Sequence, residues 1–383
     1  MKYVSPLLAC LLGMLFISCQ GLEEPQTPLD QFLQSDNQIV RQVLDDPASY
    51  GVQILISEWK NDQWVDYSYR VDDSTYFYPA STIKLPVLLA SMEQINARWS
   101  DLPVTALDSM VLVRPHSVDT VMDLYKDILA VSSNDAFNAL YGLIGPDSMH
   151  ESAERWETPL RLSHRLATTD AYNKTTGEFP IQYLQPDGRF RTLHRSKVEN
   201  QEPEVLRFRE SVIGKGYTTD DGTLIQEPFD FTKRNYYPLT SQHRILKSLT
   251  RPDDSSSIQF DIPRGQLEWL VNTMRATPAE LGYDATEFPD NHVKFILHGN
   301  GYVDGEWTTA GKIGMAYGTV TESCILSKST GEHTYVVSAT IRTNENQIYN
   351  DGLYEYQEVA MPFLTELGKC LILTKLGSEQ PNR

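Results

Sequence analysis

Ser81 and Lys84 stand three residues apart at the start of a long apolar segment that follows Pro79. At helical spacing, two such side chains lie on one face and can touch. A lysine amine can take the proton of a serine hydroxyl only when burial or a second cation lowers its pKa. A serine at a helix start also directs its own N–H toward an oxyanion. The pair therefore predicts acyl transfer through an acyl-enzyme on Ser81, with Lys84 as the base.

The alternative is an ordinary solvated helix face, because four-residue patterns of this kind arise often by chance. The surrounding residues, Phe77 to Val87, form an apolar frame apart from Ser81, Thr82 and Lys84. An apolar frame favours a buried lysine over a solvated one.

A second polar cluster, Ser132-Ser133-Asn134, precedes a segment with helical periodicity. Serine and asparagine are preferred helix N-caps, so a purely structural role is the alternative to a catalytic one. The two roles are compatible within one cluster.

A third cluster, Lys312-Ile313-Gly314 followed by Met315, ends a strand-like run near the C-terminus. The tripeptide alone has no predictive weight. Its value comes from the order and setting of all three clusters: a serine and lysine opening a helix, a serine and asparagine before a helix, and a lysine and glycine on a strand.

In that order the three clusters resemble the motifs of the class A β-lactamases and their penicillin-binding-protein relatives. The second motif of that family is S-x-N before a helix containing A-x-N-x-L, which Ala136, Asn138 and Leu140 match here. The resemblance covers most of residues 50–165 and 235–372. It implies that Ser132 relays a proton to the leaving nitrogen and that Asn134 braces Lys84 and the substrate amide.

The resemblance also assigns the third cluster. Lys312 would be the second cation, lowering the pKa of Lys84 and attracting an anionic substrate group. Gly314 would let the substrate approach the backbone, and the Met315 N–H would complete an oxyanion hole with that of Ser81. The middle position departs from the family, because Ile313 stands where a hydroxyl helps to hold a substrate carboxylate.

A second departure concerns deacylation. Class A β-lactamases use a glutamate on a loop beyond the second motif to activate water, and Glu157 superficially resembles it. The asparagine expected shortly after that glutamate is absent, so we interpret Glu157 as a surface carboxylate at a helix end. Without such a base an acyl-enzyme turns over slowly, as in penicillin-binding proteins.

The periodicities predict an α+β fold in which N- and C-terminal strands form one antiparallel sheet, flanked by helices, beside a helical lobe that carries a β-rich or irregular insertion at about residues 160–237. A hairpin is expected from 52–56 and 64–69. Helices are expected at 33–44, 81–97, 119–128, 134–145, 147–156, 240–250, 263–275 and 354–372, and strands at 293–298, 309–313, 319–327 and 334–343.

The N-terminus predicts export. Residues 1–19 have a basic start and an apolar run, too short to span a bilayer, that ends at Ser18-Cys19. The end of this segment resembles a lipobox, which implies a lipid on Cys19, residues 20–31 as a tether and residues 32–383 as the folded hydrolase. The protein would be anchored through that lipid in the bacterial cell envelope, in the periplasm or on the outer membrane. Cleavage by an ordinary signal peptidase is the alternative.

The formal charge of −18 argues against binding to nucleic acid, which requires Lys and Arg to neutralise phosphates. The eight histidines include no metal-ligand spacing, so neither a metal nor another cofactor is expected. Cys324 and Cys370 could form one disulfide or remain free thiols. The oligomeric state is left open.

Three functions are compatible with this pattern. The first is a β-lactamase-like hydrolase acting on a β-lactam or a related cyclic amide. The second keeps the chemistry but takes D-Ala-D-Ala cell-wall peptides or a small ester. The third is a non-catalytic envelope binding lipoprotein, which the isoleucine at position 313 and the missing deacylation glutamate both favour.

Overall fold

The computed structural model describes residues 27–98, 110–114, 117–177, 180–185, 187–193, 196–299, 305–329, 331 and 333–378. Cys19, the predicted signal segment and most of the predicted tether lie outside these residues.

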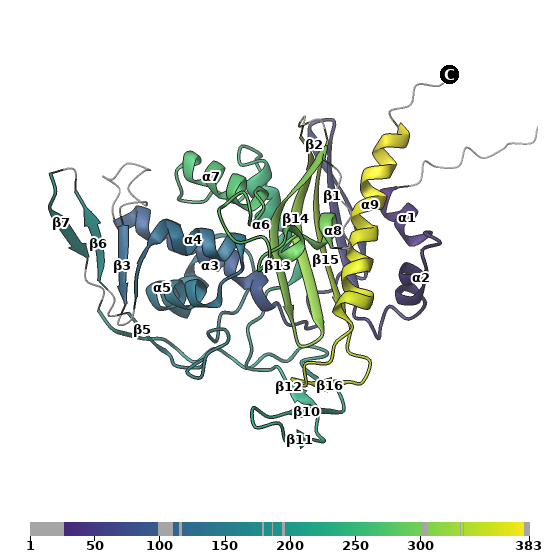
Figure 1. The fold of residues 1–383 in the computed structure, drawn as a ribbon, viewed down its shortest axis with the longest axis horizontal. Coiled ribbons are helices and arrows are strands. Elements are labelled where there is room, and N and C mark those ends of the chain that lie inside the picture. The colour runs from purple at the N-terminus through teal and green to yellow at the C-terminus, as the bar shows by residue number, and fades with distance from the viewer. Residues whose placement is uncertain are drawn as a thin grey trace, which may run out of the picture.

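The fold is organised around a five-stranded antiparallel sheet in the order β13-β14-β15-β1-β2 (Figure 1). The strands are β1 (Gln53–Lys60), β2 (Gln63–Tyr69), β13 (Trp307–Ala316), β14 (Thr319–Lys328) and β15 (Thr334–Arg342). The two ends of the chain meet where β1 pairs with β15, for example Ile54 opposite Ala339. The predicted α+β fold, with one sheet built from both ends of the chain, is confirmed.

Both faces of the sheet are covered, and the side chains of its central strands β14 and β15 are buried almost throughout, polar ones included. Successive side chains point to opposite faces. Ile325 and Val336 therefore belong to the core beneath the larger helical lobe, whereas their neighbours Leu326 and Val337 belong to the core beneath the terminal helices.

The terminal helices cover one face of the sheet (Figure 1). They are α1 (Pro28–Leu33), α2 (Gln38–Asp45), α8 (Phe295–His298) and α9 (Met361–Ser378), the last preceded by a π-helix at Tyr356–Ala360. Two predictions are corrected here. Residues 28–31 belong to α1 and not to a tether, and the helix expected at 33–44 is interrupted before Asn37, whose side chain caps α2.

The larger lobe lies on the other side of the sheet. It contains the 3₁₀ helix η1 (Ala80–Ile83), α3 (Lys84–Arg98), α4 (Val121–Ala130), α5 (Asn134–Arg155), α6 (Leu239–Thr250) and α7 (Arg264–Arg275). Helix α6 packs on β14 and β15. Helix α5 bends at Gly145, where φ is +75° before Pro146, so the two helices expected at 134–145 and 147–156 are joined across this kink.

The predicted insertion consists of short strands, some of which pair with strands outside it. They are β5 (Thr175–Thr176), β6 (Ile181–Leu184), β7 (Phe190–Leu193), β8 (Val198–Glu199), β9 (Val212–Ile213), β10 (Gly216–Thr218), β11 (Leu224–Ile225) and β12 (Phe229–Asp230). Strand β6 pairs with β3 (Met110–Arg114), which in turn pairs with β4 (Ser117–Thr120). Strand β10 pairs in parallel with β16 (Ile348–Tyr349). The insertion thus connects the helical lobe with the loop that precedes the C-terminal helix.

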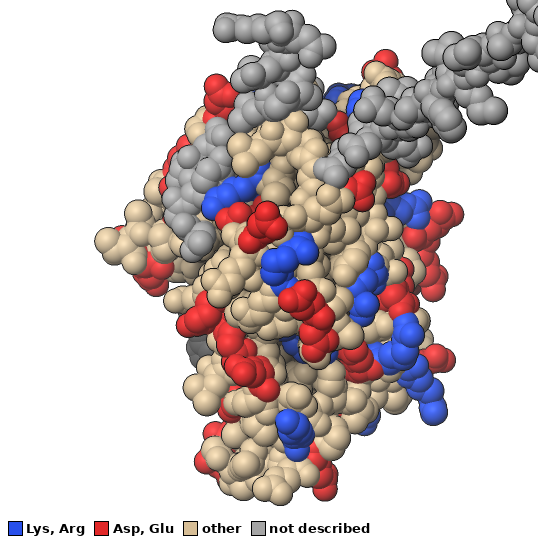
Figure 2. Space-filling model, turned by 90° about the vertical axis from the view of Figure 1, so that its right-hand side faces the viewer, with Lys and Arg blue, Asp and Glu red and all other residues tan. Residues whose placement is uncertain are grey.

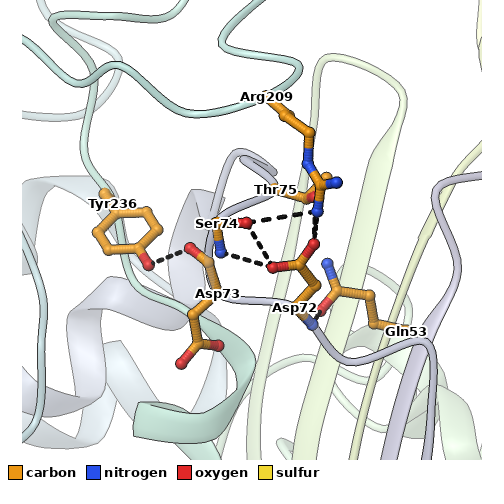
Figure 3. A network of polar contacts seen from close by, with 7 residues as sticks. All are labelled: Gln53, Asp72, Asp73, Ser74, Thr75, Arg209 and Tyr236. Carbon is orange, nitrogen blue, oxygen red and sulfur yellow. Dashed lines mark hydrogen bonds and ion pairs between the residues drawn. The ribbon is translucent and has the colours of Figure 1, made fainter.

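The insertion also holds the segment that leads into Ser81 (Figure 3). The Asp72 carboxylate accepts hydrogen bonds from Ser74 N and Thr75 Oγ1, both at 2.9 Å, and forms an ion pair with Arg209. The backbone of Arg209 pairs with this same segment, since Tyr76 N donates to its carbonyl at 2.8 Å. Tyr236 Oη donates to the Asp73 carbonyl at 2.7 Å. The chain entering η1 is therefore fixed by residues far away in sequence.

The strand predicted at 293–298 is wrong, because Phe295–His298 forms α8. Its apolar residues Phe295, Ile296 and Leu297 are all buried, so the sequence has no alternation to reveal the helical period. The buried Glu322 carboxylate accepts a hydrogen bond from Ile296 N at 2.7 Å and so satisfies the N-terminus of this short helix.

Cys324 is a buried free thiol on β14 and Cys370 is a partly buried free thiol on α9.

Over the face formed by α1, α2 and α9, acidic and basic side chains are interspersed and do not separate by sign (Figure 2). None of the helices within the described ranges is both long and apolar enough to cross a membrane.

Candidate active site

Ser81 lies on η1, directly before α3, so the predicted single helix begins as one 3₁₀ turn. Side chains three residues apart are nearly eclipsed in a 3₁₀ helix, and Ser81 and Lys84 therefore still share a face. Ala80 has a φ of +46°, in the left-handed region that residues other than glycine rarely adopt. Such local strain is concentrated at functional sites and is maintained by the surrounding structure.

Lys84 is completely buried. Its Nζ donates to Asn134 Oδ1 at 2.7 Å, to Ser132 Oγ at 3.3 Å and to the Ser132 carbonyl. Burial, and secondly the charge of Lys312, lower the pKa of Lys84 well below its ordinary value. A neutral amine could keep its two donors on Asn134 and the Ser132 carbonyl and turn its lone pair toward the Ser81 hydroxyl. Catalytic hydrogen bonds of this kind commonly tighten only when substrate is bound.

The turn between α4 and α5 separates the two roles considered for residues 132–134. Ser133 is the helix cap, since its hydroxyl accepts from Ala136 N at 3.1 Å. Ser132 adopts a φ of +57°, and its Oγ lies within hydrogen-bonding distance of both Lys84 and Lys312. Capping and lysine contact therefore coexist, on neighbouring residues.

Lys312 reaches the same hydroxyl from the sheet. Its buried Nζ donates to Ser132 Oγ at 2.7 Å and to the Ile313 carbonyl at 3.2 Å. Burial lowers the pKa of Lys312 to about 7, against the opposing charge of Glu322. The Ile313 side chain packs into the core beneath the terminal helices and has no polar group to offer a substrate.

Gly314 is the point at which β13 touches η1. A Cβ at this position would lie 2.3 Å from the Pro79 carbonyl oxygen and 3.0 Å from the backbone nitrogens of Ser81 and Thr82. Only glycine permits this approach. The next residue, Met315, lines the same cavity as Ser81.

A cavity of about 550 Å³ opens over Ser81. It is lined by Tyr78, Ala80, Ser81, Asn134, Leu166, Ala167, Met315, Ala316, Tyr317, Asn350, Asp351, Gly352 and Tyr354. Within the described part of the chain, no group of His, Cys, Asp and Glu gathers in a way that could hold a metal ion.

The sequence did not predict that Leu166 lines the cavity beside Ser81. The Asn138 side chain binds Leu166 through both backbone groups, donating to its carbonyl at 2.8 Å and accepting from its N–H at 3.0 Å. Asn138 belongs to the A-x-N-x-L segment, which was the only available signal for this contact. Leu166 is thereby held as an apolar side chain of the cavity beside Ser81.

Glu157 is not among the residues that line the Ser81 cavity. Its side chain is 79% exposed and pairs with Arg244 at 3.2 Å. It borders a different cavity of about 810 Å³, with His150 and Arg161. The interpretation of Glu157 as a surface carboxylate agrees with this position.

Comparisons with known proteins agree with the motifs. Residues 37–186 match the model of a family described as the "Beta-lactamase enzyme family". No curated protein matches the sequence. One similar solved structure is PBP-A as a leucine-to-glutamate mutant, in an acyl-enzyme complex with penicillin G. It has a TM-score of 0.52 and 14% identity over 91% of this chain and 99% of that one.

Two other similar structures are described as β-lactamases. The first, of class A from Bacteroides cellulosilyticus, has a TM-score of 0.51 and 13% identity over 93% of this chain and 100% of that one. The second, from Sphaerobacter thermophilus, has a TM-score of 0.51 and 12% identity over 88% of this chain and 96% of that one. The predicted resemblance to the β-lactamase and penicillin-binding-protein superfamily is confirmed.

We expect Gly314→Ala to slow acylation of Ser81 by about 10²-fold, the order of loss that a misplacement of about 1 Å produces. The new Cβ must displace either β13 or η1, because its nearest neighbour is the backbone oxygen of Pro79. The rate of covalent labelling by a fluorescent penicillin measures the effect. Gly265→Ala is the matched control, since a Cβ there meets nothing within 4 Å. Equal labelling rates in the two variants would contradict the prediction.

We also expect the labelling rate to depend on pH through both lysines. The rate rises with pH as Lys84 loses its proton and becomes a base, and it falls near pH 7 as Lys312 becomes neutral and no longer attracts the penicillin carboxylate. Lys312→Arg keeps its charge at every working pH and should move the falling limb upward. A falling limb that stays in place in this variant would exclude Lys312 as its origin.

Proposed function

Since the chain has the fold of the β-lactamase and penicillin-binding-protein superfamily and residues 37–186 match a β-lactamase family model, we propose that it is a serine hydrolase acylated on Ser81. Its substrate is a β-lactam or a related cyclic or peptide amide. Lys84 is the general base. One observation carries the proposal: two buried lysines converge on the Ser132 hydroxyl beside the segment that presents Ser81.

In the proposed reaction, Lys84 takes the Ser81 proton while Ser81 Oγ forms a bond to the substrate carbonyl carbon. The N–H groups of Ser81 and Met315 stabilise the oxyanion. When the C–N bond breaks, Ser132 gives its proton to the leaving nitrogen and regains one from a neighbouring lysine ammonium. Lys312 holds the anionic group on the leaving side and keeps the proton of Lys84 labile.

The acyl-enzyme is long-lived in this proposal. Hydrolysis needs a base that activates water next to the ester, and the position that Asn138 fixes in the cavity carries Leu166. The similar PBP-A structure is an acyl-enzyme of a leucine-to-glutamate mutant with penicillin G. We therefore favour penicillin-binding-protein-like turnover over rapid β-lactam hydrolysis.

We further propose that a lipid on Cys19 anchors the protein in the bacterial cell envelope. The apolar run before Cys19 supports export, and a lipid would supply the membrane affinity that an acidic chain lacks.

The proposal is tested with the purified full-length chain, a fluorescent penicillin and a chromogenic cephalosporin. We expect stable label on Ser81 with little colour, and no label in Ser81→Ala. Ser133→Ala is the matched control, because Ser133 caps α5 and contacts neither lysine through its hydroxyl. Label that persists in Ser81→Ala would exclude Ser81 as the nucleophile, and rapid colour without stable label would show efficient deacylation.

Leu166→Glu should convert slow turnover into faster hydrolysis, because it places a carboxylate in the cavity where Asn138 fixes the backbone. A positioned general base contributes about 10²-fold or more. The rate at which label is lost from Ser81 measures the change. Leu166→Gln adds a polar side chain of the same size without a base and should leave the rate unchanged. Similar rates in the two variants would refute a deacylation defect at this position.

A further inference from the structure

The Arg234 guanidinium lies among three aromatic rings, one of which, Tyr317, lines the Ser81 cavity. Its central carbon is 5.4 Å from the ring centre of Phe229, 5.6 Å from that of Tyr317 and 5.7 Å from that of Tyr172. These rings come from β12, from the turn after β13 and from the loop after α5. Contacts of this kind orient a guanidinium and stabilise its charge, but they leave its N–H donors unused.

No carboxylate or carbonyl among the described residues accepts a hydrogen bond from this guanidinium. Two other arginines of the insertion do have carbonyl acceptors: Arg161 donates to the backbone carbonyls of Glu204 and Arg234, and Arg165 donates to those of Asn173 and Thr175 at 2.6 and 3.1 Å. Arg234 is only partly exposed, so its charge is held in place without an anionic partner. A fixed guanidinium with free donors matches a carboxylate, which it can bind through two parallel hydrogen bonds.

The position of Arg234 relative to Ser81 indicates which part of a substrate would meet it. Tyr317, which Arg234 contacts, lines the cavity together with Tyr78, and their ring centres are 5.1 Å apart. Lys312 precedes Met315 on β13 and reaches Ser132, whereas Tyr317 follows Met315. The extended chain from Lys312 to Ala316 spans roughly 13 Å. The two cations therefore lie on opposite sides of the predicted oxyanion donor.

We propose that Arg234 binds a carboxylate on the acyl side of the substrate. The preferred acyl donor then carries a negative charge on each side of its reactive carbonyl, one toward Lys312 and one toward Arg234. This inference rests on the proposed acylation of Ser81 and adds the substrate class. It also gives the insertion a role in specificity, since Arg234 and two of its three aromatic neighbours belong to residues 160–237.

The test compares benzylpenicillin with α-carboxybenzylpenicillin, which differ only by a carboxylate on the acyl side chain. Their acylation rates on the full-length chain are measured by competition with a fluorescent penicillin. We expect the carboxylated compound to react about tenfold faster than the neutral one. Arg234→Gln should abolish this preference by slowing the carboxylated compound to the rate of benzylpenicillin on the same variant, and Arg234→Lys should retain part of it.

Arg251→Gln is the matched control, since the Arg251 guanidinium also lies over an aromatic ring, 4.7 Å from that of Trp59, but this ring is not among the residues that line the Ser81 cavity. It should keep the full preference. Labelling of Ser81 with equal rates for the two penicillins, or with a preference that survives in Arg234→Gln, would overturn the assignment of Arg234 alone. Absence of any labelling in the unmodified chain would overturn the proposed function and this inference with it.

Discussion

Two lysine side chains share one serine hydroxyl in the interior of this protein, and the rest of the site is arranged around that contact. Burying two like charges side by side is unfavourable unless each finds acceptors or loses its proton. Lys84 has the carbonyl of Ser132 and the amide of Asn134 as acceptors, and Lys312 has the carbonyl of Ile313. Both lysines also have lowered pKa values. The burial that brings the two lysines together thus also lowers the pKa of Lys84 and prepares it to act as a base.

Keeping this pair in place requires elements from three parts of the chain. Helix α3 supplies Lys84, the turn before α5 supplies Ser132, and β13 supplies Lys312. Two residues in the connecting segments have a positive φ: Ala80 at the start of η1, and Ser132 in the turn before α5. Their conformations persist only because the surrounding structure fixes them. The ion pair between Asp72 and Arg209 belongs to those surroundings, because it anchors the segment leading to Ala80 from the insertion (Figure 3).

The sequence was sufficient for the elements whose residues carry their own signal. Ser81, Lys84 and Lys312 could be selected because their types and order restrict the chemistry, and the hairpin of β1 and β2 follows from turn residues between alternating segments. Other features depend on contacts between distant residues. Nothing near Leu166 indicates that Asn138 will hold it in the cavity, and nothing near Arg234 indicates three rings contributed by separate segments. The apolar run at 293–298 was assigned to the wrong element because a fully buried helix and a buried strand have the same composition.

The pairing of β1 with β15 has a consequence for how the molecule is made. The hairpin of β1 and β2 emerges early during synthesis, but the other edge of β1 finds its partner only when residues 334–342 have been added. Until then β1, which carries the apolar run Ile54 to Ile56, has an unpaired edge, which is a site for association with other chains. Contacts so distant in sequence also slow folding, because the connecting chain must be ordered before they form. The central sheet can therefore be completed only after most of the chain has been made. A chain that ends before β15 still contains the predicted catalytic pair, Ser81 and Lys84, but lacks the complete sheet that positions them.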